Sequence, residues 1–203
     1  MALRRVLVIL SLLPLLEAQN PEHANITGIP ITNDTLSWLS GKWFYIGSAL
    51  HNLVFKQAAQ KIQAEYFYFT PNVTDDTILL QEYQTMEDRC VYNVSKLGVQ
   101  RENGTISKLG EDGAVEFLAH LKVFKRHGGF LLAFAPQDEK NRGLSLYGRR
   151  LPDVSPELLE EFQKAVKSLG MKESEIIYTD WKKDMCSQQQ EQSEQEKKTE
   201  EGS

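Results

Sequence analysis

The stretch TLSWLSGKW at residues 35–43 opens the region that decides the fold. It ends in Gly41-Lys42-Trp43, and from there to Arg149 short runs rich in β-branched and aromatic residues alternate with turn residues. The sequence predicts eight consecutive strands, at Gly41–Leu50, Ile62–Thr70, Thr77–Thr85, Cys90–Val94, Val99–Ser107, Val115–Phe124, Phe130–Phe134 and Leu144–Arg149. Eight successive strands favour an all-β, antiparallel, up-and-down barrel, and a seven-strand immunoglobulin-type sandwich is the alternative.

One α-helix is predicted after the strands. Ser155 is a suitable N-cap, Pro156 fits the first helical position, and Gly170 ends the pattern. The apolar residues between them recur at helical spacing: Leu158, Leu159, Phe162, Val166 and Leu169. We expect this stripe to pack on the barrel wall. Ile176-Ile177-Tyr178 then predicts a short additional strand.

The two ends of the chain differ from the middle. Arg4 and Arg5 precede an apolar run from Val6 to Leu16, and Ala18 follows, which is the pattern of a secretory signal peptide over residues 1–18. The run is too short to span a bilayer, and no later run comes close. Residues 19–186 form the predicted domain, and residues 187–203, rich in Gln, Glu and Lys, form a predicted disordered tail. The sequence therefore predicts a secreted protein without a transmembrane segment.

Two further features agree with secretion. N-glycosylation sequons occur five times, at Asn25, Asn33, Asn72, Asn93 and Asn103. The chain has two cysteines, Cys90 and Cys186, and in an oxidising compartment we expect them to form one disulfide.

Composition and motifs exclude several classes of function. The 23 basic and 28 acidic side chains give a net charge of −5 with no basic stripe, so no nucleic-acid partner is expected. The chain has four histidines, at His23, His51, His120 and His127, and none has the HxH or HExxH spacing of a metal site. No Gly-x-Ser-x-Gly nucleophile elbow occurs. We expect no catalytic residues, no metal and no cofactor.

The tripeptide Gly41-Lys42-Trp43 resembles the first signature of the lipocalins, in which Gly-x-Trp opens the first strand and the Trp plugs the closed end of an eight-stranded barrel. In that family a basic residue at the end of strand eight lies across the Trp, and Arg149 matches it. The C-terminal helix and a bridge from Cys90 to Cys186 resemble the same plan. The resemblance thus implies structural roles for Gly41, Trp43 and Arg149.

The chain resembles an outlier of that family. The middle signature, a Thr-Asp turn, is replaced by residues 125–129. Members of one outlier group are similar over nearly the whole chain, in the segments 30–33, 41–46, 100–105, 138–141 and 178–184. They usually carry a second disulfide on the N-terminal arm, for which this chain has no cysteines, so the sequence leaves open how residues 19–34 are held.

Strand alternation and the resemblance together suggest what the barrel interior contains. Ile78, Leu80, Glu82 and Gln84 share one face of the third strand, but both faces of the second strand carry aromatics, so alternation does not decide that strand. The resemblance implies these ligand-binding residues: Phe67, Phe69, Glu82, Gln84, Lys108, Phe134, Ser145 and Tyr147. Two alternatives stay open. The aromatics fill the barrel instead of lining a cavity, or Glu82 forms a salt bridge to Lys108 or Arg101 instead of binding an ammonium group.

The resemblance implies a monomeric, secreted plasma carrier of lipophilic small molecules, notably basic drugs and also steroids, with an acute-phase and immunomodulatory role. The alternative is a glycan-mediated interaction protein, read by lectins or cell-surface receptors, in which the barrel is mainly a scaffold. An enzyme is the least favoured class. One lipocalin branch uses a free thiol for isomerisation, and here both cysteines are expected in the bridge.

Overall fold

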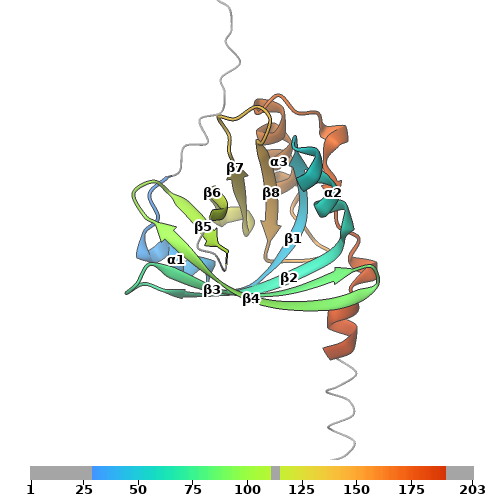
Figure 1. Cartoon of the computed structure of the whole chain (residues 1–203), viewed down its shortest axis with the longest axis horizontal. Coiled ribbons are helices and arrows are strands. Elements are labelled where there is room, and N and C mark those ends of the chain that lie inside the picture. Colours follow the sequence, from blue (N-terminus) through green and yellow to red (C-terminus); the bar gives the residue numbers. More distant parts are fainter. Residues whose placement is uncertain (1–28, 111–114, 191–203) are drawn as a thin grey trace, which may run out of the picture.

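The computed structural model describes residues 29–110 and 115–190 (Figure 1). The predicted signal peptide, the Asn25 sequon and residues 191–203 of the predicted tail lie outside this part. The elements in chain order are α1 (Asn33–Leu39), β1 (Gly41–Leu50), α2 (Leu53–Lys61), β2 (Ile62–Asn72), β3 (Thr77–Met86), β4 (Arg89–Gln100), β5 (Thr105–Leu109), β6 (Val115–Phe124), η1 (Lys125–His127), β7 (Gly129–Phe134), β8 (Gly143–Gly148), α3 (Pro156–Ser168), η2 (Glu173–Glu175), β9 (Ile177–Tyr178) and η3 (Trp181–Lys183).

Strands β1 to β8 form a closed antiparallel barrel. Each strand pairs with the next, and β1 closes the ring by pairing with both β2 and β8. The predicted short strand, β9, adds to β1 at Gly47 and Ser48, beyond the stretch that pairs with β2. The up-and-down barrel is confirmed, and the sandwich alternative is wrong.

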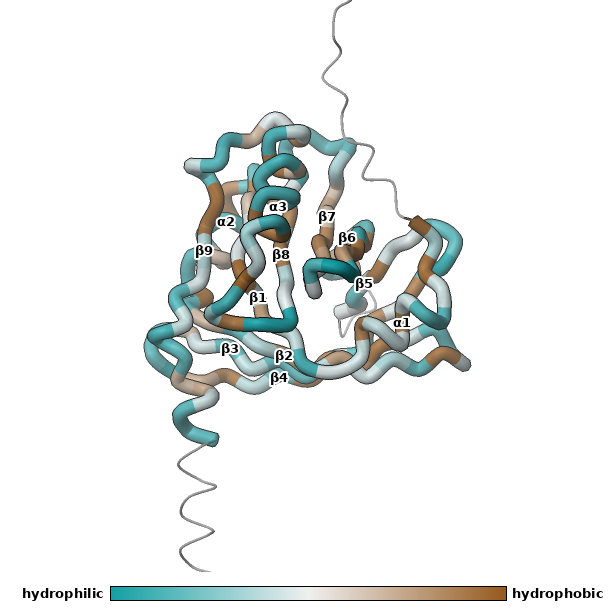
Figure 2. The backbone as a smooth tube through the Cα atoms, turned by 180° about the vertical axis from the view of Figure 1, so that it is seen from behind, coloured by the Kyte–Doolittle hydropathy of each residue, from teal (hydrophilic) through white to brown (hydrophobic). Residues whose placement is uncertain are grey.

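The two helices beside β1 mark opposite ends of the barrel: α1 lies at one end and α2 at the other (Figures 1 and 2). We call these the closed end and the open end. Neither helix was predicted as such from the sequence. Thr32 caps α1 by accepting a hydrogen bond from the Thr35 amide, and Asn52 caps α2 in the same way through the amides of Val54 and Phe55.

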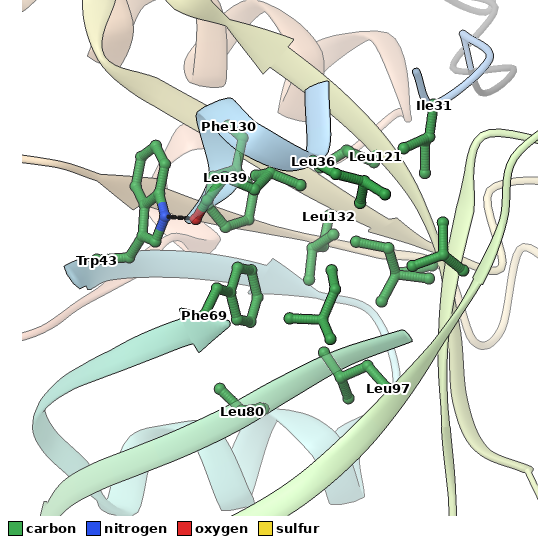
Figure 3. Packing of buried hydrophobic residues seen from close by; sticks show 14 of the residues in the cluster. Ile31, Leu36, Leu39, Trp43, Phe69, Leu80, Leu97, Leu121, Phe130 and Leu132 are labelled. Atoms are coloured by element: carbon green, nitrogen blue, oxygen red, sulfur yellow. Dashed lines mark hydrogen bonds between the residues drawn. The ribbon is translucent and has the colours of Figure 1, made fainter. Parts of the chain in front are cut away.

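The closed end is filled by apolar side chains. Leu36 and Leu39 of α1 are fully buried and pack with Trp43, Phe69 and Phe130 (Figure 3). The indole Nε1 of Trp43 donates a hydrogen bond to the Leu39 carbonyl at 2.6 Å, so the one polar atom of the plug is satisfied.

The chain before α1 is held at the closed end without a disulfide. Ile31 is 3% exposed within the core, and its amide donates to the Arg101 carbonyl at 2.9 Å. The Arg101 guanidinium also binds the Asn33 side chain at 2.8 Å and Asp76 at 2.6 Å. Burial of one apolar residue and a hydrogen-bonded arginine therefore take the place of the covalent link. Arg101 therefore lies at the closed end of the barrel.

Helix α3 covers the outside of β7 and β8, in front of them in Figure 2. Leu158, Phe162 and Val166 are buried against Leu131 and other apolar residues of the wall, as the predicted stripe requires.

The C-terminal segment covers the outer face of β1 and β2. Trp181 packs edge-on against Phe44 with ring centroids 5.0 Å apart, and the hydroxyl of the buried Tyr66 donates to Gln190 at 2.9 Å. Both faces of β2 are therefore covered, which is why alternation alone was ambiguous there. Residues 185–190 are helical, so the predicted start of a disordered tail at residue 187 falls too early.

The expected disulfide joins Cys90, at the start of β4, to Cys186, with 4.9 Å between their Cα atoms. Two strand boundaries differ from prediction in the same region. The expected strands Cys90–Val94 and Val99–Ser107 are wrong, because β4 runs without a break to Gln100 and the turn follows at residues 101–104. Gly104 in that turn has φ of +63°, a conformation that favours glycine.

Candidate functional site

A cavity of about 420 Å³ lies inside the barrel at the open end. Helix α2 contributes Phe55, Ala58 and Ala59 to its wall, and the strands add further apolar side chains, among them Phe117 and Phe134. Asn52, the cap of α2, donates to the Asn141 side chain at 2.8 Å and so ties the helix to the loop between β7 and β8. A concave, mostly apolar wall with a few polar groups is the usual form of a small-molecule site.

Most polar groups of the cavity come from four neighbouring strands, β8, β1, β2 and β3. The polar residues of the cavity are Tyr45, Ser48, Glu65, Glu82, Gln84, Glu116, Asn141, Ser145 and Tyr147, with Glu116 and Asn141 nearer the rim. Tyr45 and Ser48 both face the cavity although they are three positions apart, because the register of β1 shifts between Tyr45 and Gly47. The Tyr45 hydroxyl donates to the Ser48 hydroxyl at 2.7 Å.

Glu65 is the most enclosed carboxyl group of the cavity, with 7% of its surface exposed. It shares the inner face of β2 with Phe67, and its carboxylate accepts a hydrogen bond from the Gln84 amide at 3.2 Å. Burial, and to a smaller extent the negative charge of Glu82, together raise the pKa of Glu65 to about 8. Glu65 is therefore predominantly a neutral carboxylic acid at pH 7.

The negative charge of Glu82 has more stabilising neighbours than that of Glu65. Its carboxylate accepts a hydrogen bond from Asn93 at 3.2 Å, and the charge of Lys108 opposes the effect of burial, which still leaves its pKa raised. Lys108 itself forms its ion pair with Glu116 at 3.0 Å. In the part of the chain that the structure describes, the alternative of a salt bridge from Glu82 to Lys108 or Arg101 does not form.

The predicted site residues divide into three groups. Five line the cavity: Glu82, Gln84, Phe134, Ser145 and Tyr147. Phe67 and Phe69 are buried in the core but are not part of the cavity wall. The Phe67 ring packs edge-on against Tyr147 with centroids 5.4 Å apart, and the Phe69 ring stacks on Phe130 with centroids 6.1 Å apart. Filling of the barrel by aromatics is thus the correct description of its closed half. Lys108 lies beside the cavity, in a separate surface hollow.

Five further residues line the cavity that were not predicted from the sequence: Tyr45, Ser48, Phe55, Glu65 and Glu116. Of these five residues, only Glu65 could have been predicted from the sequence, because it lies two and four positions before Phe67 and Phe69 and so shares their face of the strand. The position of Ser48 depends on a bulge, and that of Phe55 on an unpredicted helix.

The three residues of the predicted signature lie at the closed end, away from the cavity. The Arg149 guanidinium carbon lies 3.8 Å from the centre of the Trp43 ring, which confirms the expected contact. Arg149 also donates to the carbonyls of Lys42 at 3.0 Å, Ser40 at 2.7 Å, and Trp38. Gly41 has φ of +97°, and a Cβ atom there would lie 3.2 Å from Arg149.

The four sequon asparagines that the structure describes, Asn33, Asn72, Asn93 and Asn103, are all exposed. Asn33, Asn72 and Asn103 lie near the closed end, in or beside α1 and the turns that follow β2 and β4. Asn93 is the exception, since it lies within β4 opposite Glu82. Exposure makes all four compatible with glycosylation.

A second hollow, of about 590 Å³, lies outside the barrel between η1 and the start of α3. Its wall is rich in charged side chains, including Lys125, Arg126, Arg150, Asp153 and Glu157. This wall is a poorer match to a lipophilic molecule than the cavity inside the barrel. Within residues 29–110 and 115–190, no helix is long and apolar enough to cross a membrane, and no group of three or more His, Cys, Asp or Glu could hold a metal ion.

Comparison with known proteins identifies the protein family to which this chain belongs. Residues 40–183 match the lipocalin / cytosolic fatty-acid binding protein family. The fold is similar to a solved structure of the siderocalin Ex-FABP, with a TM-score of 0.56 at 13% sequence identity over 70% of this chain and 93% of that one. The closed barrel and the family match together are those of a lipocalin.

Relatives with higher sequence identity show to which group within the lipocalin family the chain belongs. The chain is 65% identical to alpha-1-acid glycoprotein of Rattus norvegicus over 95% of its own length and 92% of the relative. Identity is 62% to alpha-1-acid glycoprotein 1 of Mus musculus, over 94% and 91%, and 48% to alpha-1-acid glycoprotein of Oryctolagus cuniculus, over 98% of both chains. The chain belongs to the α1-acid glycoprotein (orosomucoid) group of the lipocalin family.

Proposed function

We propose that this protein is a secreted plasma carrier that binds lipophilic small molecules in the cavity at the open end of the barrel, notably basic drugs and also steroids. The observation that carries the proposal is the cavity itself, which combines an apolar wall from α2, β6 and β7 with a strip of hydroxyl and carboxyl groups. The apolar wall supports binding by area removed from water, and the polar strip supports a preference for particular functional groups.

The location of the site is tested with a matched pair of variants on α2. Ala58 lines the cavity, whereas Gln60, two positions along the same helix, is exposed and does not. Ala58→Trp should therefore fill the mouth and weaken binding of an aryl amine and of a steroid by about ten-fold or more, measured by equilibrium dialysis. Gln60→Trp should leave both affinities within about two-fold. Equal binding by the two variants would place the ligand elsewhere.

We propose no catalytic role for this chain. The chain has two cysteines and both form the disulfide, so the thiol chemistry of the isomerase branch has no nucleophile here.

A second function, recognition of glycans on this protein by lectins or cell-surface receptors, is supported by the exposure of four sequon asparagines. An acute-phase and immunomodulatory role would act through this surface. Enzymatic removal of glycans separates the two proposals, because ligand binding by a monomeric barrel should survive the treatment and cell effects should not.

A further inference from the structure

Two carboxyl groups lie on the inner face of adjacent strands, and the strand register fixes their relation. Glu65 of β2 pairs directly with Gln84 of β3, and Phe67 pairs with Glu82. Glu65 and Glu82 are therefore diagonal neighbours, with a separation on the order of 7 Å between their strand positions. Both line the same cavity.

The surroundings of Glu65 contain no compensating cation among the described residues. Tyr45 and Ser48 face it from β1, Gln84 and Glu82 from β3, and Ser145 and Tyr147 from β8. Beyond Glu82, Lys108 of β5 and Glu116 of β6 are bound to each other. No ion pair in this part of the chain includes Glu65.

A carboxyl group in this position has two protonation states, and the presence of a cation decides which of them is favoured. Without a cation it keeps its proton, because an ionised carboxylate loses too much hydration when it is enclosed. If a positive charge enters the cavity, the carboxylate form becomes favourable, since attraction between opposite charges is stronger there than in water.

We propose that Glu65 receives the ammonium group of a cationic lipophilic amine and releases its own proton to solvent as the amine binds. This inference rests on the proposed carrier function. The amine keeps its proton and the carboxyl loses one, so the total charge of the occupied cavity equals that of the empty one. A neutral ligand of the same shape leaves the Glu65 proton in place.

Glu82 is the less suitable partner for the incoming charge. It already accepts a hydrogen bond from Asn93 and lies under the influence of Lys108, a cation that would repel a second one. Glu65 has a single amide donor and two phenols, from Tyr45 and Tyr147, in its surroundings. Selection between basic and neutral ligands is therefore assigned to Glu65.

Isothermal titration calorimetry measures the proposed proton release. The probes are 9-anthracenylmethylamine and its neutral match 9-anthracenemethanol, each titrated into the full chain at pH 7 in phosphate and in Tris, whose ionisation enthalpies differ. The amine should release close to one proton per molecule bound, and the alcohol none. Glu65→Gln should abolish the release and weaken the amine by about ten-fold, with little effect on the alcohol. Glu82→Gln, the matched control on the adjacent strand, should retain the release.

The pH dependence gives an independent measurement. Affinity for the amine should rise with pH by up to about ten-fold per unit below pH 8 and then level off, whereas the Glu65→Gln variant should show no such rise. Binding of the amine by the wild-type chain without proton release would overturn the inference while leaving the carrier function intact. Release that persists in Glu65→Gln would overturn it as well, by assigning the proton to another group. Binding of neither probe would instead overturn the proposed function.

Discussion

The closed and open ends of the barrel differ in how many partners their buried or half-buried charged groups have within the chain. At the closed end the charge of Arg149 is met by three carbonyl groups and the face of Trp43, and the remaining volume is filled by leucine and phenylalanine. At the open end Glu65 is more deeply buried than Arg149, but it has one amide donor and faces a cavity. At the closed end the polar groups and the volume are satisfied by the chain itself, whereas the open end has space and a carboxyl group, with no ion-pair partner among the described residues, that a ligand could contact. Stability and binding should therefore separate by position along the barrel.

The largest effect is expected from Trp43→Ala at the closed end. The indole is fully buried, so its removal should lower the free energy of unfolding by about 3–5 kcal/mol, measured by urea denaturation. Molecules that remain folded should bind ligand with nearly unchanged affinity. A loss below about 1 kcal/mol would show that the core at this end tolerates a cavity and that stability does not depend mainly on the closed end.

Arg149→Ala should cost less, about 2–3 kcal/mol, because it leaves three carbonyl acceptors without their charged donor and removes the contact with Trp43. Thermal unfolding of Arg149→Ala beside Arg149→Lys tests this, since Lys keeps the charge but not the fork of donors. Full stability combined with lost ligand binding would contradict the structural assignment.

Much of the closed end was predictable from sequence, since Gly41, Trp43 and Arg149 lie in short motifs. The strands and α3 were predictable for the related reason that alternation and helix caps are local signals. Helix α2 was not, because its first turn is a run of apolar residues, Leu53, Val54 and Phe55, that remain largely exposed. No periodic pattern marks a helix that packs on so little.

The cavity was harder to predict, because its members depend on tertiary features. Tyr45 and Ser48 face the same space only through a bulge in β1, and Phe55 only because α2 lies over the mouth. Glu65 could have been found, since it shares a strand face with Phe67. From the sequence, Glu82 was the carboxyl group considered for binding an ammonium group, and in the structure its carboxylate already interacts with Asn93 and Lys108.

Glu65→Gln should change how stability depends on pH. Because the pKa of Glu65 rises from its ordinary value of 4.5 to about 8 on folding, the folded chain holds a proton that the unfolded chain releases between these values. Wild-type stability should consequently fall as pH rises through this range. The variant lacks the effect and should be more stable than wild type by about 4 kcal/mol at pH 8, but not at pH 4. Parallel stability curves from pH 4 to pH 8 would refute this.

The smallest effect is expected from Glu82→Gln. Since Asn93 and Lys108 already interact with this carboxylate, its neutralisation should weaken a basic ligand by less than about three-fold, measured by competition dialysis. A ten-fold loss confined to amines would restore Glu82 as the main acidic group and make the two carboxyl groups equivalent.

The pairing of β1 also determines when the barrel can close during synthesis. This strand is made among the first, yet it needs β8, about a hundred residues later, and β9 beyond that, to complete its hydrogen bonds. Contacts so far apart in sequence form slowly, since a long loop must be ordered before they contribute. Until β8 emerges from the ribosome, one edge of β1 has no partner, and the nascent chain is most exposed to incorrect strand pairing during that interval.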